Sequence, residues 1–123
     1  MIRLLQRECA VLPLVLEGRW FDMIAAGEKK EEYRAFSPYW DVRLKNWDSK
    51  VKPNVCPVVE FRWGYSSTAP RMMFYVLGMN EPPKMTTYAI RNKARHPEWG
   101  EPEERHFVIS LGGPVKIVKE YME

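Results

Sequence analysis

Three charged side chains at fixed spacing give this chain its clearest capacity for chemistry. Lys29, Glu32 and Arg34 lie within residues 27–34, which read G-x-K-x-x-E-x-R. On a strand, Glu32 and Arg34 share one face because they are two positions apart, and Lys29 in the preceding turn can swing to the same side. A carboxylate between two cations stays ionised, since nearby positive charge favours its charged form. Such a cluster can bind phosphate or move a proton, and the plain alternative is a solvated charge run on an edge strand.

The elements that hold this motif are predicted from hydrophobic spacing. Residues 18–26 form a first helix, because Trp20 and Ile24 are four positions apart and give it one apolar face. Gly27 follows the last periodic residue, where a left-handed backbone ends a helix without a Cβ clash. The motif then opens a strand over residues 29–35.

Further strands are predicted from apolar runs and from alternation. Residues 11–16 are an apolar run that indicates a buried first strand, and Pro13 marks its early part as an edge or as the entry to the strand. Residues 58–63 alternate between apolar and charged side chains, as in a half-buried strand. After a polar loop at 64–71, residues 72–77 are apolar on both faces and indicate a central strand.

A second helix is predicted over residues 38–47. Ser37 is placed as its N-cap, and the proline that follows suits the first helical position. Trp40, Leu44 and Trp47 recur at helical spacing, so we expect them on the buried face.

Residues 81–105 carry four prolines and no clear periodicity, with one helical turn predicted at 87–93. A loop of this length in a small domain is usually functional or mobile. Four of its cations come with no acid among them, and four glutamates follow them: Lys84, Arg91, Lys93 and Arg95, then Glu98, Glu101, Glu103 and Glu104.

The chain ends in a predicted hairpin, in which strands at 106–111 and 115–118 flank a Gly-Gly-Pro turn at 112–114. Together the segments predict about six short strands and two early helices, and a closed or nearly closed small barrel would leave few exposed edges. The predicted fold class is therefore mainly β with helices (α+β). Residues 1–123 fit a single domain.

The motif and its setting resemble the signature of the ASCH domain family, whose members are small RNA-associated proteins. That family places G-x-K-x-x-E-x-R directly after its first helix, at the mouth of a cleft, and residues 61–72 are similar to its Gly-Tyr loop and following strand. The resemblance covers roughly residues 12–118, with no matching motif at 81–105. It implies a PUA-like small β-barrel with two packed helices, and recognition of RNA or of a nucleotide or nucleoside.

The resemblance also implies an enzymatic alternative, in which Lys29, Glu32 and Arg34 are catalytic. One bacterial branch of the family removes the acetyl group from N4-acetylcytidine with a Thr nucleophile that the motif Lys activates. Glu32 stands in place of that Thr, and a carboxylate is a poor acyl acceptor compared with a hydroxyl beside a base. Other members are proposed to cleave RNA, where Lys29 and Arg34 would stabilise developing charge while Glu32 takes a proton. The alternative function is thus a hydrolase acting on RNA or on a modified nucleoside.

In the binding interpretation, Lys29 and Arg34 contact phosphate or a base edge, and Glu32 accepts from an exocyclic amine. Tyr65, in a polar loop, supplies a stacking surface, unless it only caps the core. Arg71 would follow the RNA backbone together with the loop cations named above. If the ligand is a single nucleotide instead of a polymer, binding should respond much less to salt.

Composition narrows the partners. The net charge of +3 and the 13% of aromatic residues are compatible with a polyanion and with base stacking. His96 and His106 are ten positions apart, outside the spacing of metal ligands, so we expect no metal and no cofactor. Cys9 and Cys56 are far apart in sequence and nothing indicates secretion, so we expect reduced thiols. The charged N-terminal residues and the lack of a long apolar run predict a cytoplasmic protein with no membrane partner.

Overall fold

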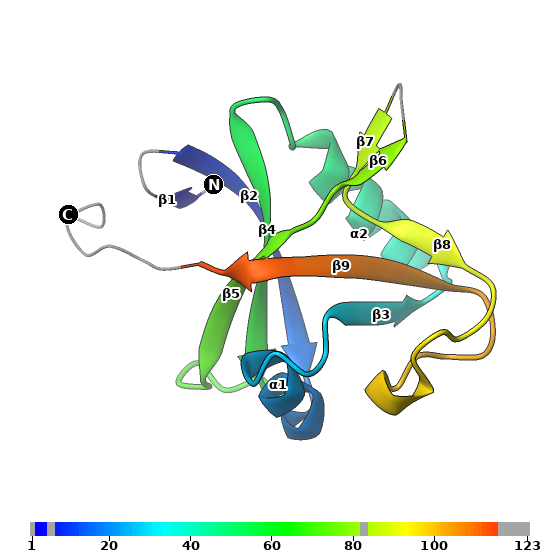
Figure 1. The fold of residues 1–123 in the computed structure, drawn as a ribbon. Coiled ribbons are helices and arrows are strands. Elements are labelled where there is room, and N and C mark those ends of the chain that lie inside the picture. The colour runs from blue at the N-terminus through cyan, green and yellow to red at the C-terminus, as the bar shows by residue number, and fades with distance from the viewer. Residues whose placement is uncertain (1, 5–6, 82–83, 116–123) are drawn as a thin grey trace.

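Seven strands form one curled sheet in the part of the chain that the computed structural model describes, residues 2–4, 7–81 and 84–115. The sheet and two helices make a mixed α+β fold, which confirms the predicted class of a small barrel-like sheet with two packed helices (Figure 1). In spatial order the strands are β1 (Ile2–Leu4), β2 (Arg7–Leu16), β4 (Val55–Trp63), β5 (Arg71–Val76), β9 (His106–Pro114) and β3 (Glu31–Ala35), and β8 (Ala89–Arg91) also pairs with β9. The other elements are α1 (Gly18–Ala25), α2 (Pro38–Ser49), the hairpin strands β6 (Met79–Glu81) and β7 (Lys84–Thr86), and the 3-10 helix η1 (Pro97–Trp99).

The sheet curls because β9 pairs with two groups of strands. In Figure 1, β2, β4 and β5 run together, and β9 crosses them with β3 and β8 alongside it. Along β9, Phe107 lies opposite Arg34 of β3, whereas Leu111 lies opposite Val76 of β5. The register of the β5–β9 pairing shifts between its two paired positions, and such irregularities bend a sheet locally.

β3, at one end of this strand path, approaches the open edge of β2, near the other end of the path. β2 pairs with β4 along most of its length, but β1 covers its other side only at residues 7–9. Pro13 therefore lies on an open edge of β2, as predicted. The Nη2 of Arg34 on β3 donates to the carbonyl oxygen of Val15 on β2, at 3.1 Å. We call the gap that this hydrogen bond bridges the β2–β3 cleft.

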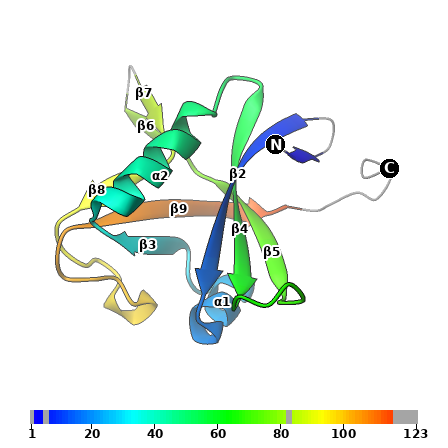
Figure 2. The ribbon, with the colours of Figure 1, turned by 180° about the vertical axis from the view of Figure 1, so that it is seen from behind.

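α2 packs along the open edge of β2, on the face of the molecule seen in Figure 2. The side chain of Ser37 accepts a hydrogen bond from the backbone N–H of Trp40, which confirms the predicted N-cap. Leu44 and Trp47 are buried, and the indole N–H of Trp47 donates to the carbonyl oxygen of Ala10 at 3.0 Å. Among the described residues, no helix has the length and apolar character needed to span a membrane.

α1 ends as predicted, at a glycine with a left-handed backbone. Gly27 has φ of 78°, a conformation that side chains with a Cβ rarely adopt. The next turn stays attached to the helix, since the backbone N–H of Lys29 donates to the carbonyl oxygen of Met23. β3 consequently begins at Glu31, two residues later than predicted.

The core lies between the inner faces of the sheet and the buried sides of the two helices. The central strands and both helices contribute apolar side chains to it, which fits the apolar runs seen in the sequence. Its largest fully buried aromatic and aliphatic members are Leu14, Ile24, Leu44, Phe61, Phe107 and Ile109.

Two predicted elements are wrong. The segment at 87–93 contains strand β8 paired with β9, not a helical turn. The predicted hairpin turn at 112–114 is part of β9, which stays extended as far as Pro114, where it lies opposite Phe74 of β5. Both errors have one cause, because the pairing of β9 with distant strands decides these conformations and local turn residues do not. The second strand of the predicted hairpin is expected at 115–118, and residues 116–118 lie outside the described part of the chain.

Candidate functional site

The structure brings the three charged residues of the motif together. Glu32 lies between the two cations, with its Oε1 3.4 Å from the Nζ of Lys29 and its Oε2 3.2 Å from the Nη2 of Arg34. The backbone N–H of Tyr33 donates to the same Oε1 at 2.9 Å. The carboxylate is therefore held in one orientation by three donors from β3 and the turn before it.

Lys29 is buried behind Glu32 and links several parts of the site through hydrogen bonds. Only 2% of the residue is exposed, and its ammonium donates to the carbonyl oxygens of Glu31, at 2.6 Å, and Trp99, at 3.1 Å. With Glu32, these partners account for its three N–H groups. Burial lowers the pKa of Lys29, while the charge of Glu32 and the hydrogen bond to it oppose that shift. In this arrangement Lys29 fixes Glu32 and Trp99, and its predicted contact with a ligand stays a prediction.

Arg34 lies at the centre of the β2–β3 cleft. Its Nη2 donates to Val15 and to Glu32, and its guanidinium lies over the ring of Trp40, 4.9 Å from the centroid. Its Nε is buried, and no acceptor for it exists among the described residues. A buried donor without an acceptor is costly, so Arg34 is the group in this cluster that a ligand oxygen would satisfy.

Two cavities adjoin Arg34. The larger has a volume of about 400 Å³ and opens between β2, α2 and the loop after β4. Its walls carry three guanidinium groups and three aromatic rings: Arg34, Arg43, Arg62, Tyr39, Trp40 and Tyr65. Positive charge together with ring faces suits a ligand that combines anionic and aromatic groups.

The walls of the larger cavity are partly fixed. Arg43 donates to the carbonyl oxygen of Pro13 at 3.0 Å and lies over Trp40, 4.9 Å from the ring centroid. Arg62 is paired with Glu60 at 3.0 Å. Tyr65 is 90% exposed, so its ring stands at the rim and does not cap the core.

The smaller cavity has a volume of about 200 Å³ and lies on the other side of Arg34, beside α1. Trp20 of α1 and Trp99 of η1 line it together with Tyr33 and the carboxylate of Glu32. Gly100, with φ of 77°, packs so closely against Trp20 that a Cβ there would lie 2.6 Å from the indole ring. The loop after β8 thus completes this cavity.

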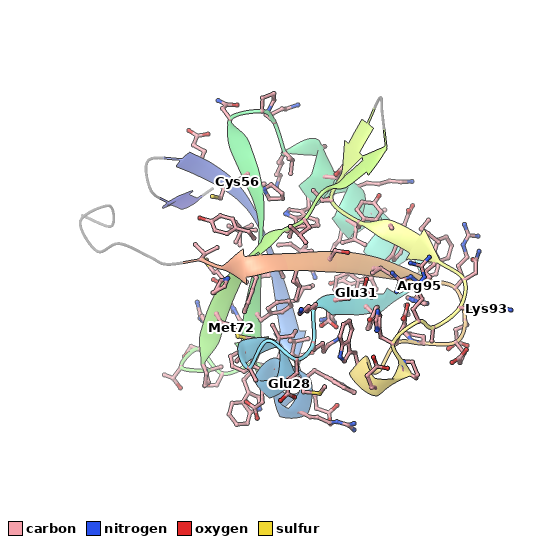
Figure 3. All side chains as sticks on the ribbon, viewed as in Figure 1. Glu28, Glu31, Cys56, Met72, Lys93 and Arg95 are labelled. Atoms are coloured by element: carbon pink, nitrogen blue, oxygen red, sulfur yellow. The ribbon has the colours of Figure 1, made fainter. Side chains whose placement is uncertain are left out.

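A buried network of charges anchors that loop to β3. Arg91 of β8 contacts both oxygens of Glu31, at 2.9 and 3.0 Å, and one oxygen of Glu101, at 2.7 Å. Glu101 also accepts from the backbone N–H groups of Arg95 and His96. Figure 3 labels Glu31 and Arg95 on this side of the sheet. These contacts fix the position of the segment after β8. Arg91 therefore has a structural role, as the ion-pair partner of two carboxylates.

His106 completes this network from β9. The residue is fully buried, and its Nε2 lies 2.6 Å from an oxygen of Glu101. Burial by itself would raise the pKa of Glu101, but hydrogen bonds from the His96 backbone, Arg91, the Arg95 backbone and His106 outweigh it and hold that pKa at about 2.

The other predicted site residues lie in different places. Tyr65 and Arg34 line the larger cavity, as the binding interpretation expects. Arg71 lies opposite Arg62 in the β4–β5 pairing, is exposed, and lines neither cavity. Its predicted contact with an RNA backbone stays a prediction.

Sequence reasoning missed several residues of the cleft. Trp20 and Trp40 were assigned to the core by helical spacing, and Arg43 and Arg62 were not singled out. Trp99 carried no signal, because it enters the site through the long-range anchoring of its loop. The generous aromatic content was the one general indication that some rings would be left for the surface.

The arrangement suits binding better than proton transfer. The carboxylate of Glu32 is held in one orientation by Lys29, Arg34 and a backbone N–H, and these three donors leave it able to accept one more hydrogen bond from a ligand. Among the described residues, no group of three or more His, Cys, Asp or Glu side chains is placed to hold a metal ion.

Comparison with known proteins does not show a family for this chain. No family model matches the chain, and no match is found among curated proteins or among solved structures. The resemblance of the motif to the ASCH family therefore rests on the residues quoted for it.

Proposed function

We propose that this chain, as its resemblance to the ASCH family implies, recognises RNA or a nucleotide or nucleoside through the β2–β3 cleft. The observation that carries the proposal is at Arg34, which borders two cavities lined by aromatic rings and has a buried Nε–H for which the described residues supply no acceptor. A phosphate or base oxygen at that point would supply the acceptor.

The two cavities suggest where the different groups of such a ligand would bind. The larger one, with three guanidinium groups, suits the phosphate and a ring that stacks on Tyr65 or Trp40. The smaller one, between Trp20 and Trp99, has the size for a base, and Glu32 at its wall can accept a hydrogen bond from a base N–H. Arg34 borders both cavities and would contact the ligand where it passes from one to the other.

The proposal does not include hydrolysis. Glu32 is held in a fixed orientation by its three donors, and Lys29 uses its three N–H groups on fixed oxygens. Neither residue is arranged to activate a nucleophile.

Binding of a labelled single-stranded RNA of mixed sequence, followed by fluorescence anisotropy, tests the proposal. Arg43→Ala and Arg62→Ala should each weaken binding about tenfold, as expected when a charge-assisted hydrogen bond is lost. Lys52→Ala is the matched control, because it removes one exposed positive charge at the opposite end of β4. At roughly 3.3 Å per residue the two ends of β4 are more than 20 Å apart, well beyond the screening length of about 8 Å.

Two outcomes would contradict the proposal. If Lys52→Ala weakens binding as much as the cleft variants do, the attraction is diffuse and the cleft is not the site. If neither RNA nor any free nucleotide binds to the parent protein, the cleft does not recognise this class of ligand.

A further inference from the structure

The two cysteines of the chain lie side by side on neighbouring strands. Cys9 of β2 and Cys56 of β4 are direct partners in the parallel pairing of these strands. Their Sγ atoms are 2.6 Å apart, although the residues are separated by 47 positions in the sequence. No disulfide joins them in the structure.

The backbone at this point is compatible with a covalent bridge. Neighbouring strands lie about 4.8 Å apart, and bridged cysteines have Cα atoms roughly 4.4–6.8 Å apart. Both Cβ atoms leave the same face of the sheet, because directly paired residues share a face. A bond between the two sulfurs therefore requires only a small approach of the side chains and no movement of the strands.

The two thiols differ in access. Cys9 is fully buried in a small apolar cluster with Val58 and Met73, on the face of the sheet that points away from the main core. Cys56 is partly exposed at the end of β4 that lies away from α1 (Figure 3). A reagent in solvent reaches Cys56 first, and Cys9 is the thiol already placed to react next.

We propose that Cys9 and Cys56 form a modification site, a dithiol that peroxides convert reversibly into an intramolecular disulfide. The peroxide transfers one oxygen atom to the sulfur of Cys56, giving a sulfenic acid and one molecule of water or alcohol. The thiolate of Cys9 then attacks that sulfur, so the S–S bond forms as the S–O bond breaks, and the departing hydroxide takes up the Cys9 proton as water. The two thiols lose two protons and two electrons in total, which the peroxide accepts.

The bridge would close a loop that contains α1, β3 and α2, and with them the whole motif at 27–34. Cross-linking a long segment restricts the unfolded chain and stabilises the folded one. Oxidation should therefore raise the melting temperature, by on the order of 10 °C for a domain of this size. The site is independent of the RNA proposal, since neither sulfur lines a cleft cavity.

Intact-mass spectrometry of the folded protein after treatment with hydrogen peroxide tests this site. The parent protein should lose the mass of two hydrogen atoms, take up no N-ethylmaleimide, and remain a monomer on a non-reducing gel. A thiol reductant should restore two maleimide-reactive groups and reverse the rise in melting temperature. Cys56→Ser should show neither the mass loss nor the rise.

The contrary results are distinct. Stable sulfinic acid on Cys56 with Cys9 still reduced would overturn the proposal, and so would disulfide-linked dimers in place of an intramolecular bridge. Because the parent protein carries the main measurement, a folding defect in the Cys56→Ser variant would not affect the outcome.

Discussion

The network around Arg91 and the cleft around Arg34 use the same residue types for different purposes. Arg91 makes three hydrogen bonds to Glu31 and Glu101, two carboxylates that come from β3 and from the loop after η1. Arg34 shares a carboxylate with Lys29, borders two cavities, and has a buried Nε–H for which the described residues supply no acceptor. An arginine paired with two carboxylates holds a fold together, whereas one with a buried donor left over marks a place for a ligand.

Removing Arg91 should cause the largest loss of stability. Arg91→Ala leaves Glu31 and Glu101 without their cation in a largely buried site, and the loss of one partner of a buried pair costs about 3–5 kcal/mol. Urea unfolding should show this decrease in the free energy of unfolding. Arg62→Ala is the control from the cleft, where a partly exposed pair contributes about 0–1 kcal/mol. Equal effects of the two substitutions would show that the network is not the anchor described here.

Acid should weaken the network around Glu101. The pKa of Glu101 is lowered from its ordinary value of 4.5 to about 2, so the folded state binds this proton less readily than the unfolded state. The resulting stability is complete above pH 4.5 and is lost as the pH falls through that range to about 2, to a total of about 3 kcal/mol. Urea unfolding at a series of pH values should show this slope, and Glu101→Gln should flatten it. A parent protein whose stability is constant between pH 5 and about 2 would contradict the assignment.

Substitutions of Tyr65 test ligand binding in the cleft with little effect on the stability of the fold. Its ring is 90% exposed at the rim of the larger cavity, so Tyr65→Ala should change the free energy of unfolding by about 0.5 kcal/mol or less. If the ring stacks on a base, RNA binding should weaken by about 1–3 kcal/mol. Tyr65→Phe keeps the ring and should bind like the parent. An alanine variant with unchanged affinity would remove Tyr65 from the site.

The smallest effect is expected at Arg71. It is exposed and lines neither cavity, so Arg71→Ala should weaken RNA binding only about twofold at moderate salt. If three or four phosphates are engaged, the log–log salt slope for a single strand is about −2 to −3, and losing one contact reduces its magnitude by about 0.7. A slope identical to that of the parent protein would place Arg71 outside the RNA path.

The parts of the molecule that could be predicted are those that local rules determine. Gly27 ends α1 because of its backbone freedom, and the two-residue spacing of Glu32 and Arg34 puts both on one face of β3. The burial of Lys29 could not be foreseen, because one of its partners, Trp99, lies 70 positions away. Long-range pairing also decided β8 and the extended end of β9.

The same limit explains why the network was missed. Arg91 and Glu31 are 60 positions apart, and in sequence Arg91 looks like one of several loop cations. Only the pairing of β8 with β9, next to β3, brings them together. Charge counts along a loop therefore did not separate the cation that anchors the fold from those that face solvent.

If a ligand oxygen accepts a hydrogen bond from the Nε–H of Arg34, the NMR signal of that group should report it. The arginine Nε–H resonances of the folded protein can be followed while a short single-stranded RNA is added, with Arg34→Lys used to assign the Arg34 signal. This resonance should shift and exchange more slowly with solvent as RNA binds, while the resonance of Arg91, which lines neither cleft cavity, should stay in place. An Arg34 signal that stays unchanged while RNA binding is visible elsewhere in the spectrum would contradict this expectation.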